Sequence, residues 1–246
     1  MADFSTIAQY YDQMTNFDKR LVGDFGVIKH LVEKFRVKSA LDAGCGTGVH
    51  SIILAKLGIE VVGVDSAEEM IEGARVNALR EGLQLEFAND RFEAMPLGWS
   101  ERFDTIFCLA NSLVGVETAE RLSLSFKSFQ RVLKPGGRAI IQLLNFVHYR
   151  SNKIRIFKVS TNQNLTFVRF FDFEKEVTRL NVLVIEHDMG QVKHQFISQP
   201  ILPVNTEVIE VAANINGFSG VGFYADLSLG DRYRADGENL VAVVTK

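Results

Sequence analysis

The chain has 246 residues, of which 47% are hydrophobic and 23% charged, and its formal net charge is -3. This composition is typical of a folded globular protein and excludes a disordered one. The net charge and the lack of a long basic run argue against nucleic acid as a partner. No apolar run approaches the roughly 18 residues that span a bilayer, so we expect no membrane partner either.

The N-terminal residues have neither the basic segment nor the apolar segment of a secretory signal, so a cytoplasmic location is expected. In that setting Cys45 and Cys108 are expected to be buried free thiols rather than a disulfide. Residues 1–36 are predicted to form an N-terminal helical cap of two helices within residues 3–35. Asp3 or Ser5 would cap the first helix.

A glycine-rich stretch follows, reading Ala-Leu-Asp-Ala-Gly-Cys-Gly-Thr-Gly over residues 40–48. An apolar strand over 37–41 leads into Asp42, and a helical pattern begins after the last glycine. The glycines occupy alternate positions: Gly44, Gly46 and Gly48. Because glycine has no Cβ, a ligand can lie directly against this backbone, and the open amides of the helix start favour polar groups. The alternative is a tight turn that binds nothing.

The spacing of the glycines distinguishes this turn from the dinucleotide fingerprint Gly-x-Gly-x-x-Gly. The third glycine comes one position early, which favours a nucleoside ligand over a pyrophosphate cofactor. Asp42 would sit badly beside phosphates but would suit a ligand with an ammonium group.

A short β-branched strand over 60–64 ends in Asp65, about 20 residues after Gly44, where folds of this kind bind ribose hydroxyls. A carboxylate suits that task because it accepts hydrogen bonds from both hydroxyls. The alternative is a surface residue that caps the next helix, a role that Ser66 fits better. The helix over 67–81 places Met70 inward.

Strands are predicted next over 85–88, 103–110 and 138–144, with a helix over 117–133 and a Lys-Pro-Gly-Gly turn before the last strand. Alternation of strands and helices indicates a parallel sheet, whose ligands bind at the carboxyl ends of the strands. Polar residues and a glycine follow these strand ends on one predicted rim: Gly44, Asp65, Asn89, Asn111 and Asn145.

The periodicity changes in residues 150–200, where polar and apolar residues alternate between breaks that include Gly190. This pattern predicts a small antiparallel β insertion after the fifth strand. The insertion could be a scaffold, a homodimer interface or a lid over the substrate, with Arg169 as an anchor for an anionic group. A helix over 205–216 and strands over 220–225 and 240–245 complete the chain. We therefore predict a single domain over 1–246: a Rossmann-like, seven-stranded, mostly parallel sheet with helices on both faces, plus the insertion.

The motif Asp-x-Gly-x-Gly-x-Gly after a strand resembles the first motif of the class I S-adenosylmethionine-dependent methyltransferases. Tyr10-Tyr11-Asp12, Cys-Leu-Ala-Asn-Ser-Leu over 108–113 and Leu-Lys-Pro-Gly-Gly over 133–137 are similar to further segments of small-molecule members, distantly those of the glycine N-methyltransferases. The resemblance implies S-adenosylmethionine as cofactor and S-adenosylhomocysteine as product. The cofactor contacts that it implies are Tyr11, Asp42, Gly44, Cys45, Gly46, Gly48, Asp65, Ser66, Met70, Asn89, Asp90, Arg91, Leu109 and Asn111.

For such an enzyme the sulfonium already activates the methyl group, so no metal is required and positioning dominates catalysis. The candidate catalytic residues are Asn111, Tyr11 and His148, and the candidate contacts to a small-molecule acceptor are Asn111, Asn145 and Arg169. Glycine N-methyltransferases end the fifth strand in an Arg-Asn pair whose arginine holds the glycine carboxylate. Here the pair is Leu144 and Asn145, which argues against glycine as acceptor.

Two other functions fit the same sequence. A non-catalytic module could bind S-adenosylmethionine and dock a partner through the β insertion, because methyl transfer demands little of the side chains. An NAD(P)-dependent oxidoreductase is the third hypothesis, and the early third glycine argues against it.

Overall fold

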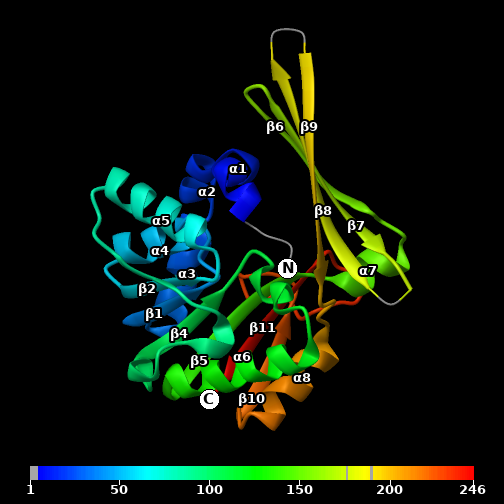
Figure 1. The fold of residues 1–246 in the computed structure, drawn as a ribbon. Helices are drawn as coiled ribbons and strands as arrows, with labels where there is room; N and C mark the ends of the chain where they lie inside the picture. The colour runs from blue at the N-terminus through cyan, green and yellow to red at the C-terminus, as the bar shows by residue number, and fades with distance from the viewer. Residues whose placement is uncertain (1–4, 176, 189–190) are drawn as a thin grey trace.

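The computed structural model describes residues 5–175, 177–188 and 191–246, so Asp3 and Gly190 lie outside the described residues. Its larger sheet contains the strands β1 (Ser39–Ala43), β2 (Glu60–Asp65), β3 (Glu86–Asn89), β4 (Phe103–Cys108), β5 (Leu133–Leu144), β10 (Gly220–Tyr224) and β11 (Asn239–Thr245). The strand order is β10-β11-β5-β4-β1-β2-β3, and the strands from β10 to β2 are labelled in Figure 1.

The strands β1 to β5 run parallel, and the order reverses between β1 and β4. The last two strands are antiparallel, with β11 paired to β5 and β10 to β11. The predicted Rossmann-like, mostly parallel seven-stranded sheet is therefore confirmed. Ligands of such sheets bind at the carboxyl ends of the strands, beside the reversal point.

Helices cover both faces of this sheet and are named in chain order. They are α1 (Ser5–Thr15), α2 (Phe17–Gly23), α3 (Phe25–Phe35), α4 (Val49–Lys56), α5 (Glu68–Arg80), α6 (Ala119–Val132), α7 (Phe146–Ser151) and α8 (Thr206–Ile215), with short 3-10 turns at Phe92–Ala94, Leu97–Trp99 and Ser112–Val116. One core joins the sheet to α3, α4 and α5, and the other joins it to α6 and α8.

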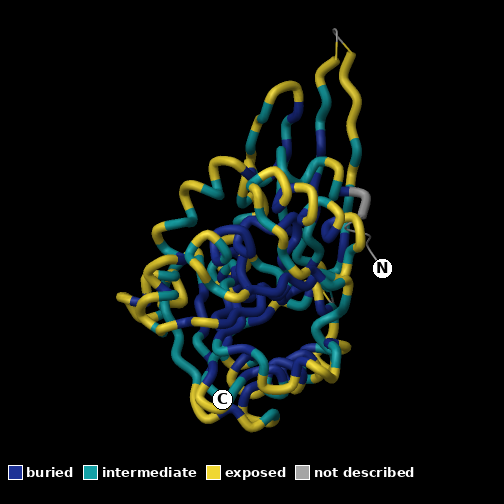
Figure 2. The backbone as a smooth tube through the Cα atoms, turned by 90° about the vertical axis from the view of Figure 1, so that its left-hand side faces the viewer, coloured by how far each residue is buried: buried dark blue, intermediate teal, exposed yellow. Residues whose placement is uncertain are grey.

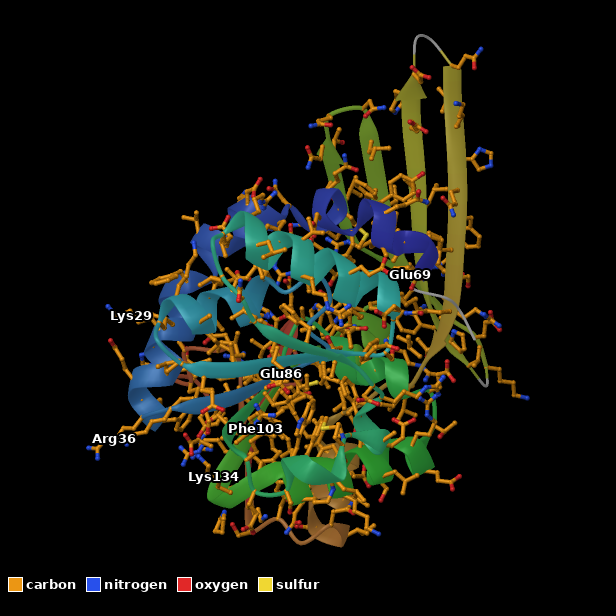
Figure 3. All side chains as sticks on the ribbon, turned by 60° about the vertical axis from the view of Figure 1, so that its left-hand side comes forward. Lys29, Arg36, Glu69, Glu86, Phe103 and Lys134 are labelled. Carbon is orange, nitrogen blue, oxygen red and sulfur yellow. The ribbon has the colours of Figure 1, made fainter. Side chains whose placement is uncertain are left out.

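Burial on both faces explains the almost continuous apolar character of the central strands. All five residues of β1 are buried, and in Figure 2 the buried backbone fills the middle of the molecule. Figure 3 shows the contrast at the surface, where Lys29 and Arg36 point outward from the α3 region. Cys45 and Cys108 are both buried and free, as the sequence predicted.

The insertion forms a separate antiparallel sheet of four strands in the order β6-β7-β8-β9. Its strands are β6 (Ile156–Asn162), β7 (Leu165–Phe173), β8 (Thr178–Asp188) and β9 (Gln191–Ile201). Figure 1 shows this sheet rising away from the larger one, beside α1. An apolar cluster joins α1 to the insertion sheet, with Ile7 and Met14 packed among Phe167 and Val184. The N-terminal helix thus lies between the insertion and the rest of the protein.

The structure differs from the predicted elements at the N-terminus, at the start of β5 and at α7, a helix that was not predicted. The N-terminal cap has three helices instead of two, because Asn16 adopts a left-handed backbone (φ 58°) and its side chain caps α2 at the amide of Lys19. Strand β5 begins at Leu133 rather than at residue 138. The Lys-Pro-Gly-Gly segment is a bulge in this strand, because Phe103 pairs with Leu133 while Thr105 pairs with Arg138.

Candidate active site

A cavity of about 1390 Å3 opens at the carboxyl ends of the parallel strands and is bounded on its other side by α1, α2 and the insertion sheet. This volume exceeds the 300–1,000 Å3 typical of one small-molecule pocket. Ten of the predicted site residues line the cavity: Tyr11, Gly44, Gly46, Asp65, Ser66, Met70, Asp90, Arg91, Asn111 and Arg169.

The glycine loop is fastened to the neighbouring strand at its first turn. The amides of Gly44 and Cys45 donate to the carbonyl of Val64 at 2.8 and 3.0 Å. Gly44 has a φ of +74°, and a Cβ there would lie 2.4 Å from the Cβ of Ser112. No other residue can occupy this position without moving the segment that follows β4.

Asp65 faces the cavity from the end of β2, where it also shapes the glycine loop. Its Oδ2 accepts from the amide of Gly46 at 2.9 Å and its Oδ1 accepts from the amide of Ala67 at 3.1 Å. Burial raises the pKa of this carboxyl, and these backbone bonds offset part of the effect. Each carboxylate oxygen keeps a further lone pair, which is available to ligand hydroxyls.

Asn89 and Asp90 are both among the predicted cofactor contacts, but only Asp90 lines the cavity. Asp90 lines the cavity, and its amide donates to the carbonyl of Asp65 at 3.1 Å. Asn89 is exposed outside the cavity, with its amide donating to that same carbonyl.

Tyr11 reaches the cavity from α1 and covers the glycine loop. A Cβ on Gly46 would lie 3.3 Å from its ring. Burial raises the pKa of the Tyr11 phenol, so the hydroxyl stays protonated at neutral pH. The neighbouring Asp12 anchors the helix, because it accepts from the Asn77 amide on α5 at 2.9 Å.

Asn111 is held firmly at the end of β4. Its backbone amide donates to the carbonyl of Gln142 at 3.0 Å, and its side-chain Oδ1 accepts from the backbone amide of Leu144 at 3.1 Å. Both Ala110 and Asn111 have positive φ angles, 54° and 71°. Backbone strain of this kind concentrates at functional sites, where surrounding bonds hold it.

A cluster of charged groups that the sequence analysis missed also lines the cavity. The Arg20 guanidinium donates to Asp24 at 3.1 Å, and the Nε2 of His50 lies 3.1 Å from Arg20 and 3.3 Å from Asp24. Burial opposes ionisation of Asp24, but the hydrogen bond with His50 and the Arg20 charge lower its pKa overall. The i, i+4 spacing of Arg20 and Asp24 was a signal for their pairing. Only the packing of α2 on α4 brings His50 to them.

The other predicted site residues do not line the cavity: Asp42, Cys45, Gly48, Asn89, Leu109, Asn145 and His148. Asp42 is buried beneath the loop, where it accepts from the hydroxyl of Ser51 at 2.6 Å, and burial raises its pKa. Cys45 and Leu109 belong to the core on the α4 side of the sheet. Gly48 precedes α4 with a φ of +88°, and a Cβ there would lie 3.1 Å from that of Ala74.

Asn145 and His148 lie outside the cavity and have other contacts. The Asn145 amide is 1% exposed and donates to the carbonyls of Arg234, Ala235 and Gly237 at 3.3, 3.0 and 2.7 Å. The Asn145 side chain thus anchors the loop before β11, and its Oδ1 accepts from the hydroxyl of Tyr233. The His148 ring lies on α7 outside the cavity and contacts Asn152.

Among the described residues, no group of three His, Cys, Asp or Glu side chains is placed to hold a metal ion. The helices described here include none that is long and apolar enough to cross a membrane.

A parallel sheet with a glycine-rich turn after its first strand and an acidic residue after its second defines an α/β protein that binds a nucleoside-containing ligand. Comparison with known proteins identifies its family. A family model described as a methyltransferase domain matches residues 35–193, and the chain therefore belongs to this methyltransferase family. The resemblance to class I methyltransferases is confirmed.

Curated relatives that match part of the chain include proteins named as N-methyltransferases and as O-methyltransferases. A glycine/sarcosine N-methyltransferase of Aphanothece halophytica is 30% identical over 136 residues, which cover 55% of this chain and 51% of the relative. A ubiquinone biosynthesis O-methyltransferase of Ruegeria sp. (strain TM1040) is 38% identical over 105 residues, 43% of this chain and 40% of the relative. The chain matches about half the length of these curated relatives, or less.

Solved structures share the whole fold at lower identity. An S-adenosylmethionine-dependent methyltransferase from Clostridium acetobutylicum ATCC 824 has a TM-score of 0.78 at 18% identity, with 98% of both chains covered. A sugar N-methyltransferase from Streptoalloteichus sp. ATCC 53650 has a TM-score of 0.71 at 21% identity, covering 95% of this chain and 92% of that one.

Proposed function

We propose that this chain binds S-adenosylmethionine and transfers its methyl group to a nitrogen or oxygen of a small-molecule acceptor by direct in-line displacement. The observation that carries the proposal is the convergence of Gly44, Gly46, Asp65 and Asp90 on one cavity in a methyltransferase-family chain. S-Adenosylmethionine supplies a methyl group already activated by its sulfonium, and the product is S-adenosylhomocysteine.

The residues present fit this cofactor. Gly44 and Gly46 line the cavity, and Ser112 and Tyr11 pack where their Cβ atoms would be, so a nucleoside would meet the backbone of the loop beside these two side chains. Asp65 has spare acceptor capacity for the ribose hydroxyls, and Asp90 stands one strand further along for the adenine amino group. The Tyr11 ring packs on Gly46 and would shield the glycine loop from water.

Catalysis would rest on positioning rather than on a strong base. Of the predicted catalytic residues, Asn111 and Tyr11 line the cavity. Asn111 is fixed by two backbone hydrogen bonds, so it can orient an acceptor with little loss of entropy. The raised pKa of Tyr11 suits it to donate a hydrogen bond at neutral pH, not to remove a proton. The acceptor proton would pass to solvent.

Calorimetric titration with S-adenosylmethionine and S-adenosylhomocysteine, run beside NADH, tests the proposal. Binding of both sulfur nucleosides without binding of NADH is the expected result. Binding of NADH alone would favour the oxidoreductase, and failure of all three would reduce the glycine loop to a structural turn. Tight cofactor binding with a stable partner complex and no turnover across a broad panel of amines and phenols would favour the non-catalytic module.

The lid role of the insertion, the homodimer through it and the cytoplasmic location stay predictions. Support for the homodimer comes from apolar side chains on the insertion sheet, where Phe196 and Val159 are each 56% exposed and Phe196 stacks on Phe170. Light scattering of the wild type and Phe196→Glu measures it: a dimer that becomes a monomer is expected, and a monomeric wild type would exclude this interface.

A further inference from the structure

Arg169 occupies an unusual place in β7. Side chains two residues apart on a strand point to the same face, and those of Phe167 and Phe171, on either side of Arg169, are fully buried. Its cross-strand partner on β8, Val182, is 5% exposed. A permanently charged guanidinium therefore lies in a row of buried apolar side chains on the face that closes the cavity.

No described residue forms an ion pair or hydrogen bond with this guanidinium. Its Nε is buried without an acceptor, and the group stands 5.8 Å from the centre of the Phe157 ring. Burial lowers the pKa of Arg169. Because burying an unpaired charge is costly, such a group is normally paired or binds a ligand.

Two other arginines that line the cavity, in contrast, form ion pairs. Arg20 is paired with Asp24, and Arg121 is paired with Glu93 and Glu117. The positive charge of Arg20 also acts on Arg169, and Lys158, the cross-strand partner of Arg169 on β6, lines the same cavity. Like charges directly opposite in a sheet are destabilising, and an anion placed between them removes that cost.

We propose that Arg169, assisted by Lys158, binds an oxyanion of the methyl acceptor, so that the enzyme acts on acceptors carrying a carboxylate or a phosphate. This inference rests on the proposed function. The acceptor side of the cavity is favoured because both cations come from the insertion sheet, whereas Gly44, Asp65 and Asp90 stand at the ends of the larger sheet. The Phe157 ring beside Arg169 provides an apolar wall for the body of the same molecule.

The test begins with cofactor affinity in the wild type, Arg169→Met and the control Arg179→Met. Arg179 lies on the same insertion sheet, is paired with Glu174 and does not line the cavity. All three proteins are expected to bind S-adenosylhomocysteine with the same Kd within threefold. A loss of tenfold or more in Arg169→Met, with unchanged binding of 5′-methylthioadenosine, would assign Arg169 to the cofactor carboxylate and overturn the inference.

The second step probes the oxyanion directly. Acetate and inorganic phosphate are titrated separately into each protein saturated with S-adenosylhomocysteine, and the arginine Nε–H resonances are followed by NMR. The Arg169 resonance, identified by its absence in Arg169→Met, is expected to shift saturably with at least one anion. The larger response distinguishes a carboxylate site from a phosphate site. An Arg169 resonance that does not move up to 50 mM of either anion would overturn the inference.

A third step joins the site to recognition of an organic ligand. The matched probes 4-hydroxybenzoate and 4-hydroxybenzamide differ in the anionic group alone. If either binds, we expect the carboxylate to bind the wild type and Arg179→Met at least tenfold more tightly than Arg169→Met, with Arg169→Lys between them. Equal carboxylate affinity in all variants would contradict the inference. Failure of the wild type to bind S-adenosylhomocysteine in the first step would contradict the proposed function instead, so the two failures are distinguishable.

Discussion

The ring of Tyr11 lies against Gly46, so close that a Cβ on the glycine would come within 3.3 Å of it. This contact joins the first helix of the chain to the loop that follows the first strand. It makes the two segments one binding surface, although 34 residues of other structure separate them in the sequence. The packing of Tyr11 on the loop therefore requires a residue without a side chain at position 46.

Substitutions of Tyr11 separate its ring from its hydroxyl. Tyr11→Phe keeps the ring over the glycine loop, so the Kd for S-adenosylhomocysteine is expected to stay within threefold of the wild type. Tyr11→Ala opens the loop to water and is expected to weaken binding at least tenfold, about 1.4 kcal/mol. Calorimetry measures both. Equal losses in the two variants would assign the effect to the hydroxyl.

Gly44→Ala is expected to lower both stability and cofactor affinity. Its φ of +74° costs an L-residue about 1–2 kcal/mol, and the new Cβ would lie 2.4 Å from that of Ser112. Urea unfolding and S-adenosylhomocysteine titration measure the two effects. The matched control is Gly26→Ala on α3, where a Cβ meets nothing within 4 Å and no positive φ is required. That variant should keep wild-type affinity and equal or greater stability.

Asp65→Asn and Asp65→Ala are expected to weaken S-adenosylhomocysteine binding at least tenfold, about 1.4 kcal/mol. The amide can no longer accept from the ribose hydroxyls through both oxygens, and alanine accepts nothing. Asp18→Asn is the control, since that side chain is 82% exposed on α2. Unchanged affinity in the Asp65 variants would remove the ribose assignment.

The pH dependence of binding follows from the same carboxyl. Because burial raises the pKa of Asp65 above the ordinary value of 3.8, acidification protonates it earlier than an exposed aspartate. Cofactor affinity is expected to fall as the pH drops through that raised value. The contribution of Asp65 to folding has the opposite sign: it is largest below the unfolded pKa and is lost as the pH rises through the folded one. Cofactor titrations and urea unfolding from pH 8 to 4.5 measure the two trends. The part of each trend that comes from Asp65 should be missing in Asp65→Asn.

Asn145→Ala is expected to lower the free energy of unfolding by about 2–4 kcal/mol, because it leaves carbonyls of the 234–237 loop without their donor. Tyr233→Phe removes only the hydroxyl that donates to Asn145, and should cost about 1 kcal/mol. Urea unfolding compares them. A stable Asn145→Ala protein that binds cofactor normally and loses only turnover would support the predicted contact between Asn145 and the methyl acceptor.

The sequence located the sheet, the glycine loop and Asp65 because these depend on local patterns: a buried strand, a turn that needs glycine, and an acid at the next strand end. The sequence pattern identified which residues follow the strand ends, but not the direction in which each side chain points. Asn145 follows a strand end as predicted, yet its amide turns toward a loop about ninety residues later in the chain. The i, i+4 spacing of Arg20 and Asp24 was a signal for their pairing, but the approach of His50 could not be predicted, since only the packing of α2 on α4 brings it to them.

The insertion sheet is one uninterrupted excursion of the chain, leaving after α7 and returning before α8. The residues proposed to bind the cofactor lie outside that excursion, while Lys158 and Arg169 lie inside it. On the proposed assignments, changes confined to this contiguous segment would alter the anion contacts of the acceptor without touching the proposed cofactor contacts, while Asn111 would stay in place. In a family whose relatives methylate both nitrogen and oxygen, this separation makes residues 156–201 the natural segment to exchange between members when a new acceptor is sought.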